Sequence, residues 1–170
     1  MQPVTDNEIT RKMIGFIESL GIPVKFTTGI EGTFLPGLRI ENGAILADEQ
    51  VHFYPGDLLH EAGHLAVVPA AERATLCNED IGRREHHAAE EMMSIAWSFA
   101  ACLHLGIDPL VVFHENGYKN GGAEIAENFS KGQYFGVPML QWIGLTHDPA
   151  GKELPENAVL FPKMIKWMRD

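Results

Sequence analysis

The stretch Asp57-Leu58-Leu59-His60-Glu61-Ala62-Gly63-His64-Leu65 contains the pattern HExxH, which reads here as HEAGH. Residues four apart on an α-helix project from the same face, so the rings of His60 and His64 could reach one metal ion. Imidazole nitrogens are good zinc ligands, and a catalytic zinc lowers the pKa of its water to about 7. The motif therefore predicts a Zn²⁺ site in which Glu61 is the general base.

The residues around the motif favour a short helix. Tyr54-Pro55-Gly56-Asp57 is typical of a turn that ends in the N-cap residue Asp57, and the apolar pattern that follows stops at Pro69. Gly63 costs a helix up to about 1 kcal/mol relative to alanine, but together with Ala62 it leaves room for close packing against another element. The alternative is that both histidines of the motif are ordinary helix residues.

Length and composition describe a globular chain. With 170 residues, 45% of them hydrophobic, we expect a single domain over residues 1–170 with a substantial core. The net charge is -10 and the basic residues are scattered, so neither nucleic acid nor a membrane is expected as a partner. Cys77 and Cys102 do not form a CxxC motif, which argues against a disulfide framework or a cysteine zinc site.

The absence of targeting and membrane-spanning patterns predicts a soluble cytoplasmic protein, and the C-terminal residues predict a helix. Residues 1–6 carry neither the basic nor the apolar region of a secretory signal, and no later apolar run is long enough to span a membrane. Leu160–Met168 is expected to form a last helix beginning around Pro162. Its solvated side would carry Lys163, Lys166 and Arg169.

Upstream of the motif, the patterns predict one helix and a small sheet. Thr5-Asp6-Asn7-Glu8 is typical of a capping box, and apolar residues recur at helical spacing over 9–20. Residues 23–28 favour a strand, and residues 38–47 predict a hairpin with Asn42-Gly43 as its turn. We therefore expect a small, mostly antiparallel sheet ahead of the HEAGH helix.

Downstream of the motif, the chain reads as largely helical, which makes the predicted fold class α+β. Helices or helical turns are expected at 70–77, 83–105, 109–113, 121–129 and 137–145, with a loop at 78–82. Gly106 is expected to end the long helix, and Asp108 to cap the short helix that Pro109 begins.

The helix expected over 83–105 carries Glu90 and Glu91, either of which could supply a third metal ligand. At about 100° per residue, one apolar face of this helix is formed by Met92, Ile95, Ala96, Phe99 and Leu103. Glu91 borders that face, whereas Glu90 lies almost opposite it, so the helical phase predicts Glu91 as the ligand. The adjacent His86 and His87 could also supply a ligand, but we expect them to be solvated.

The order of these parts resembles that of the gluzincin peptidases. An N-terminal helix, a small sheet, an HExxH helix and a later helix bearing a glutamate follow one another. The layout over roughly Ile40–Leu103 is most similar to the small intracellular ImmA/IrrE-type peptidases. This resemblance implies a minimal zincin-like fold and a His-His-Glu zinc site formed by His60, His64 and Glu91. Gluzincins of the thermolysin type place a polar partner of a zinc histidine four residues after the ligand glutamate. Ser94 has that position relative to Glu90, which keeps Glu90 open as the alternative ligand.

The resulting prediction is a small cytoplasmic metallopeptidase that acts on a peptide or protein substrate. The strand Ala44–Ala47 would bind extended substrate by β-addition, as the edge strand does in the enzymes it resembles. The alternative is a non-catalytic, zinc-binding regulatory or scaffold protein of the same fold. Ligand types do not reveal whether the fourth coordination position is open.

Two further groups of residues need an interpretation. The loop after Phe113 contains His114, Glu115, Tyr118 and Lys119. Zincin sites often recruit a tyrosine or histidine from such a loop to stabilise an oxyanion, but we expect a plain surface loop. Because no basic groove accompanies them, the three tryptophans are expected to be core or partly buried residues: Trp97, Trp142 and Trp167.

Overall fold

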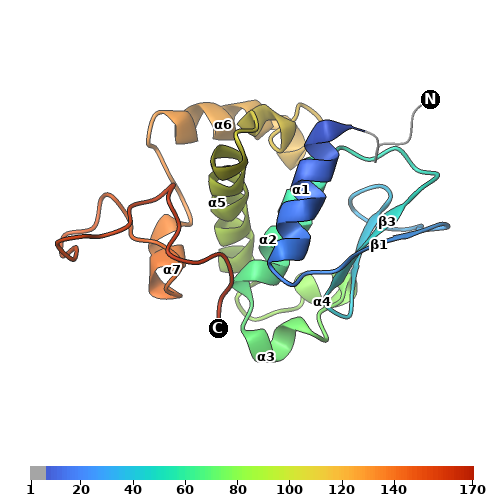
Figure 1. Cartoon of the computed structure of the whole chain (residues 1–170), viewed down its shortest axis with the longest axis horizontal. Helices are drawn as coiled ribbons and strands as arrows, with labels where there is room; N and C mark the ends of the chain where they lie inside the picture. Colours follow the sequence, from blue (N-terminus) through green and yellow to red (C-terminus); the bar gives the residue numbers. More distant parts are fainter. Residues whose placement is uncertain (1–6) are drawn as a thin grey trace.

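The computed structural model describes residues 7–170 and confirms the α+β class (Figure 1). The strands are β1 (Val24–Thr27), β2 (Leu38–Glu41) and β3 (Ala44–Asp48). The helices are α1 (Glu8–Ser19), α2 (Asp57–Val67), α3 (Ala70–Arg73), α4 (Asn78–Ile81), α5 (His87–Leu105), α6 (Gly122–Ser130) and α7 (Val137–Trp142), with 3₁₀ turns η2 (Pro109–Val111) and η3 (Tyr118–Asn120). The HEAGH motif lies on α2, as predicted.

The sheet is mixed, with the strand order β1-β3-β2. β2 and β3 form the predicted antiparallel hairpin, in which Ile40 pairs with Ile45. Asn42 and Gly43 both have positive φ, as a tight two-residue hairpin turn requires. β1 runs parallel to β3, so the expectation of a mostly antiparallel sheet was wrong. On the outer edge of β2, the Ile40 amide donates a hydrogen bond to Asn78 Oδ1 at 2.7 Å, so this edge is occupied. β1 pairs instead with the other edge of β3.

β3 is therefore the central strand of the sheet, and this position bears on the prediction that it binds substrate. The backbone of Ala44–Ala47 is paired with β1 on one side and with β2 on the other. Addition of a strand requires an unpaired sheet edge. The expectation that this strand binds substrate by β-addition was wrong.

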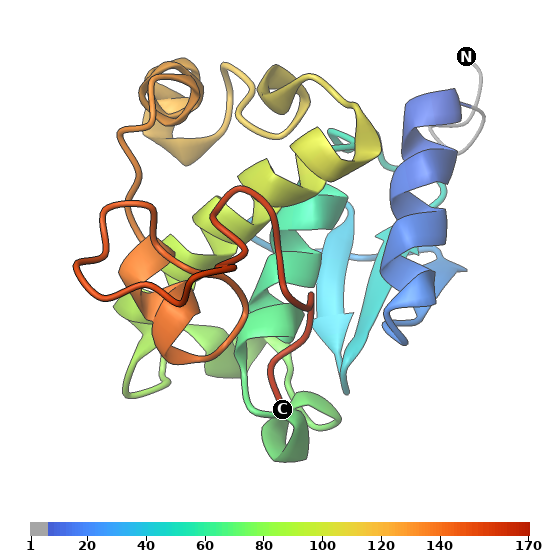
Figure 2. The same ribbon diagram turned by 60° about the vertical axis from the view of Figure 1, so that its left-hand side comes forward.

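α2 is buried along its whole length. In Figure 2 it lies between the sheet on one side and α5 on the other. The side of the sheet that faces the core carries Val24, Leu38, Ile40, Ile45 and Ala47, which are all buried. Met13 and Ile17 of α1 join the same core. A helix that is covered on every side can hold polar side chains only where they have partners or a function.

The N-terminus of α1 is capped by Asn7, whose Oδ1 accepts a hydrogen bond from the Ile9 amide at 2.9 Å. The first two residues of the predicted capping box, Thr5 and Asp6, lie outside the described residues. The signal-free N-terminus expected for residues 1–6 lies outside them too. The apolar residues of α1 follow the predicted helical spacing.

The start of α2 differs from the prediction by one residue. Gly56 occupies the N-cap position, and Asp57 is the first helical residue and makes no capping hydrogen bond. A Cβ on Gly56 would overlap the carbonyl of Val111, so glycine allows η2 to pack on the start of α2. Asp57 is left free to contact His114.

The segment before α5 also differs from the prediction. Residues 78–81 form the short helix α4 instead of a loop, and α5 begins at His87, four residues later than expected. Arg84 precedes α5 and forms ion pairs with Glu72 and Glu90, which hold this segment in turns. α5 ends at Gly106 in the left-handed conformation, and Asp108 Oδ1 accepts from the Leu110 amide at 2.9 Å, both as predicted.

The predicted C-terminal helix was wrong. Leu160 forms an isolated β-bridge with His147, and residues 161–170 follow as turns and bends. They run back along the end of α2, where the Arg169 amide donates to Ala66 O (Figures 1 and 2). Their backbone groups bond to other elements: the Ile165 amide donates to Leu145 O at 2.8 Å, and Trp167 O accepts from Trp97 Nε1 at 2.9 Å. These tertiary hydrogen bonds replace the local ones that a helix would have formed.

Two of the three tryptophans lie where they were expected. Trp97 is fully buried and Trp167 is partly buried against it, but Trp142 at the end of α7 is 82% exposed. The expectation for Trp142 was therefore wrong. Over residues 7–170, no helix has both the length and the apolar character needed to cross a membrane.

Candidate metal centre

α2 and α5 bring together two imidazoles and one carboxylate. The Nε2 atoms of His60 and His64 are 3.1 Å apart. The Glu91 carboxylate reaches both, with Oε1 at 3.6 Å from His60 Nε2 and Oε2 at 3.1 Å from His64 Nε2. Within residues 7–170, this is the one group of at least three His, Cys, Asp or Glu side chains with ligand atoms so close together.

These distances suit a cation at the centre of the group. Zinc bonds of about 2 Å in tetrahedral geometry separate ligand atoms by roughly 3.3 Å. The observed separations of 3.1–3.6 Å lie close to that value. The residues could therefore hold a metal ion, and the geometry leaves open which metal it is.

Each histidine has a hydroxyl partner on its other ring nitrogen. Tyr118 Oη lies 2.9 Å from His60 Nδ1, and Ser94 Oγ lies 3.4 Å from His64 Nδ1. Ser94 donates its hydroxyl hydrogen to the carbonyl oxygen of Glu90 at 2.8 Å, so it can only accept from His64. His64 Nδ1 therefore carries the hydrogen, and in the neutral ring Nε2 presents a lone pair to the centre of the site.

Glu90 points elsewhere and forms a different interaction. Its buried carboxylate accepts two hydrogen bonds from Arg84, at 2.7 Å from Nε and 2.9 Å from Nη2. The side chain of Glu91 is 43% exposed and faces the two histidines. The structure thus places Glu91, and not Glu90, beside His60 and His64. Its role as a ligand stays a prediction.

The predicted packed face of α5, from which Glu91 was chosen, was only partly right, because Ile95, Ala96 and Phe99 are buried but two other members are not. Met92 and Leu103, which belonged to the predicted packed face, are 38% and 46% exposed. The face that meets α2 carries Ser94 and Ser98, and Ser98 Oγ donates to Leu59 O at 3.3 Å. Small polar residues allow the two helices to approach closely, and an apolarity pattern does not detect such a face.

Glu61 lies beside the three candidate ligands and has an unsatisfied oxygen. Its side chain is buried, and Oε2 has no hydrogen-bond partner among the described residues. Burial raises the pKa of Glu61 to about 7, and the charges of Asp57 and Glu91 act in the same direction, while His64 opposes them. A carboxyl group with this pKa can both accept and return a proton near neutral pH.

The two histidines titrate differently. Burial and the neighbouring His64 lower the pKa of His60 to about 4, so His60 is neutral at pH 7. Burial alone would lower the pKa of His64, but the Glu91 hydrogen bond and the charges of Glu61 and Glu91 outweigh it and raise that pKa. Burial opposes the ionisation of Glu91, but the two histidines lower its pKa, so the carboxylate is ionised.

The loop after Phe113 belongs to the site, so the expectation of a plain surface loop was wrong. Besides the contact of Tyr118 with His60, His114 Nε2 lies 3.0 Å from Asp57 Oδ1, where Asp57 is buried and His114 is partly buried. The ring of Tyr54 stacks on His114 with centroids 3.9 Å apart. Burial raises the pKa of Asp57 in spite of this contact. Glycines 117, 121 and 122 around Tyr118 were the available sequence signal for a chain that folds back on itself.

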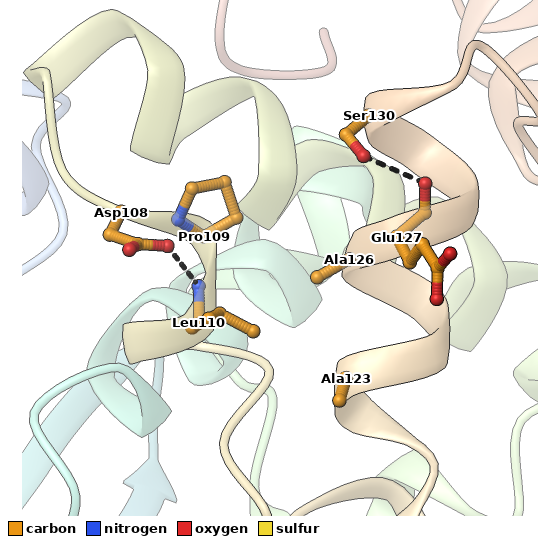
Figure 3. A pocket seen from close by; sticks show the side chains of 7 residues that line it. All are labelled: Asp108, Pro109, Leu110, Ala123, Ala126, Glu127 and Ser130. Carbon is orange, nitrogen blue, oxygen red and sulfur yellow. Dashed lines mark hydrogen bonds between the residues drawn. The ribbon is translucent and has the colours of Figure 1, made fainter.

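Other polar groups lie away from this centre. His86 and His87 are exposed, as expected. A hollow of about 400 Å³ lies between η2 and α6 (Figure 3). Its polar groups are engaged locally: Asp108 caps η2, and Ser130 Oγ donates to the Glu127 carbonyl. This hollow offers no chemistry comparable to the His-His-Glu group.

Comparison with protein-family models, with curated proteins and with solved structures found no match to this chain. Functional inference therefore depends on the motif and on the geometry of these side chains.

Proposed function

We propose that the protein is a zinc-dependent hydrolase, a small metallopeptidase of the gluzincin type that acts on a peptide or protein substrate. The observation that carries this proposal is the position of Glu61. A buried carboxylate with one unpaired oxygen lies beside a group of two imidazoles and a carboxylate. A purely structural metal site has no use for an uncompensated buried carboxylate, which is costly to keep.

The donor set supports zinc as the metal. Two histidine nitrogens and one carboxylate, here His60, His64 and Glu91, are a ligand set that hydrolytic zinc sites use. A bound Zn²⁺ would polarise a carbonyl group and make a water molecule a good nucleophile at neutral pH. The side chain of Glu91 is 43% exposed, whereas those of His60 and His64 are 11% and 8% exposed, so substrate would approach past Glu91.

Glu61 would accept the proton of the attacking water and deliver it to the leaving amine. Burial raises the pKa of the Glu61 carboxyl group, which makes it a stronger base than an exposed glutamate. Ser94 would keep the ring of His64 in a fixed orientation.

Metal content and turnover together test the proposal. Purified wild-type protein should contain close to one zinc per chain by elemental analysis, and His60→Ala or His64→Ala should lose it. His87→Ala, at an exposed position, is the control and should retain it. Stoichiometric metal in the His60→Ala/His64→Ala double variant would reject the site.

Glu61→Gln separates catalysis from metal binding, because the amide keeps the size of the side chain but cannot take a proton. This variant should keep its zinc and lose hydrolysis of a mixed peptide panel. If wild type binds zinc but shows no turnover, and Glu61→Gln is indistinguishable from it, the non-catalytic zinc-binding function is the correct one.

A further inference from the structure

The turn that carries Tyr118 has an unusual backbone conformation. Tyr118, Lys119 and Asn120 have φ values of 53°, 54° and 67°, and none of them is glycine. A left-handed conformation costs such a residue roughly 1–2 kcal/mol. Strained residues of this kind persist where the surrounding structure holds them, and they cluster at functional sites.

Two polar contacts to α2 hold this loop. The partly buried His114 contacts Asp57 at the start of the helix, and Tyr118 Oη contacts Nδ1 of His60 one turn further on. The Tyr118 ring also packs edge-on against His60, with centroids 5.5 Å apart. Gly122 lets the chain return past the carbonyl of Phe113, where a Cβ would be only 2.7 Å away. The strained turn is therefore held by His114 before it, by Tyr118 within it and by the close packing of Gly122 after it.

The Tyr118 oxygen can accept the hydrogen that a metal-bound His60 would carry on Nδ1. When a cation lies between His60 and His64, both Nε2 atoms must present lone pairs, so both Nδ1 atoms carry hydrogens. The hydrogen on His64 points to Ser94. For His60 Nδ1, Tyr118 Oη is the only hydrogen-bond partner that the described part of the chain provides.

We propose that Tyr118 is a positioning residue of the metal centre, which accepts the Nδ1–H of His60 and so directs Nε2 at the metal, and that the His114–Asp57 contact holds Tyr118 in place. This inference depends on the proposed metal site. Removing the oxygen leaves a buried N–H without a partner and frees the ring to turn. Loss of such an outer partner typically weakens metal binding 10–100-fold.

Tyr118→Phe tests the first part, because it keeps the ring and removes only the oxygen. Zinc affinity is measured by competition with a chromophoric chelator, and we expect it to fall at least about tenfold. Tyr134→Phe is the matched control, since Tyr134 packs against Phe161 and lies outside the centre, and its affinity should not change. In zinc-loaded, ¹⁵N-histidine-labelled protein, the His60 Nδ1–H should exchange slowly with solvent in wild type and rapidly in Tyr118→Phe.

His114→Phe tests the second part, because it keeps an aromatic ring against Tyr54 and removes the contact with Asp57. We expect weaker zinc binding, and no additional loss when Tyr118→Phe is combined with it, because both changes act through one hydrogen bond. Thermal unfolding of each variant checks folding. Should His114→Phe be unstable, Asp57→Leu/His114→Phe removes the unpaired charge and gives the same test.

The outcomes distinguish this inference from the proposed function. If wild type binds zinc and Tyr118→Phe binds it within twofold, with unchanged His60 exchange, the positioning role is rejected while the metal site stands. Additive losses in the double variant reject the link through His114. If wild type binds no zinc, the proposed function fails and the positioning role fails with it.

Discussion

Gly63 of α2 lies directly against the backbone of Ser94 in α5. A Cβ on Gly63 would be 3.0 Å from the Ser94 carbonyl oxygen and 3.2 Å from its Cα. The side chain of the same serine lies 3.4 Å from Nδ1 of His64. The close approach that glycine allows is therefore also what brings a hydroxyl partner to one of the two motif histidines.

Gly63→Ala should consequently lower stability, although alanine is the better helix former. The added methyl group meets backbone atoms, which cannot move aside as a flexible side chain can, and overpacking of this kind costs about 1–3 kcal/mol. Gly15→Ala in α1 is the control, because nothing lies within 4 Å of its Cβ position and it should gain up to about 1 kcal/mol. Urea unfolding of both variants measures the difference. Equal gains would show that α2 and α5 can separate freely.

Substitution of Glu91 should affect zinc binding, whereas substitution of Glu90 should affect the free energy of unfolding. Glu91→Ala should weaken zinc binding strongly with little change in stability, since its carboxylate is partly exposed and faces the histidines. Glu90→Ala should lower the free energy of unfolding by about 1–3 kcal/mol, because two buried charged hydrogen bonds are lost while Arg84 keeps its ion pair with Glu72. Zinc titration and urea unfolding of each variant separate the two effects. Loss of zinc in Glu90→Ala with retention in Glu91→Ala would reverse the assignment.

Most of the fold could be predicted where local sequence chemistry decides it. The Asn42-Gly43 turn, the Gly106 helix end and the Asp108 cap all act within a few residues, and the structure contains all three. The parallel pairing of β1 and the course of residues 160–170 depend on partners far along the chain. No local pattern predicts which strand β1 will pair with or which elements residues 160–170 will contact.

The candidate site could be predicted only in part for a similar reason. His60, Glu61 and His64 are fixed by the spacing of one helix, so the motif identifies them directly. Tyr118 reaches the site through a strained turn, which has no periodic signature. Glu91 was chosen from an apolar face that is partly exposed in the structure, although the residue does lie beside the histidines.

Asp48, at the end of β3, should make stability depend on pH. Its carboxylate accepts hydrogen bonds from the amides of Gln50 and Ile30, both at 2.8 Å, and these lower its pKa. A depressed pKa means that Asp48 stabilises the fold above its unfolded pKa of about 3.9 and loses this contribution as the pH falls through the folded value.

Asp48→Asn should therefore be less stable than wild type at neutral pH, and the gap should narrow below about pH 4. Urea unfolding at a series of pH values measures the gap. Glu49→Gln, at the exposed neighbouring position, controls for the loss of one negative charge. A gap that stays constant down to pH 2 would show that the charge of Asp48 does not contribute.

Two arginines from different parts of the chain, Arg73 and Arg169, donate hydrogen bonds to the carbonyls at the C-terminal end of α2. Four consecutive carbonyls at this end have no partner within the helix. Arg73 donates to Leu65 O at 2.7 Å and to Val68 O at 3.2 Å. Arg169 donates to Ala66 O through its amide at 2.9 Å and to Val67 O through its side chain at 3.2 Å. Arg73 also bonds to the carbonyl of Arg169, so the C-terminal segment and the HEAGH helix are held together.

Arg73→Met should remove the hydrogen bonds of its guanidinium while keeping much of its apolar stem. Buried carbonyls that lose a charged donor cost about 1–3 kcal/mol each, so we expect the free energy of unfolding to fall by about 2–3 kcal/mol. Release of the C-terminal segment should also make residues 160–170 more accessible to trypsin at Lys163 and Lys166. Arg83→Met is the control, because the exposed Arg83 side chain makes no hydrogen bond or ion pair within residues 7–170. If Arg73→Met and Arg83→Met unfold at the same urea concentration and are cleaved at the same rate, the end of α2 is held by apolar packing alone.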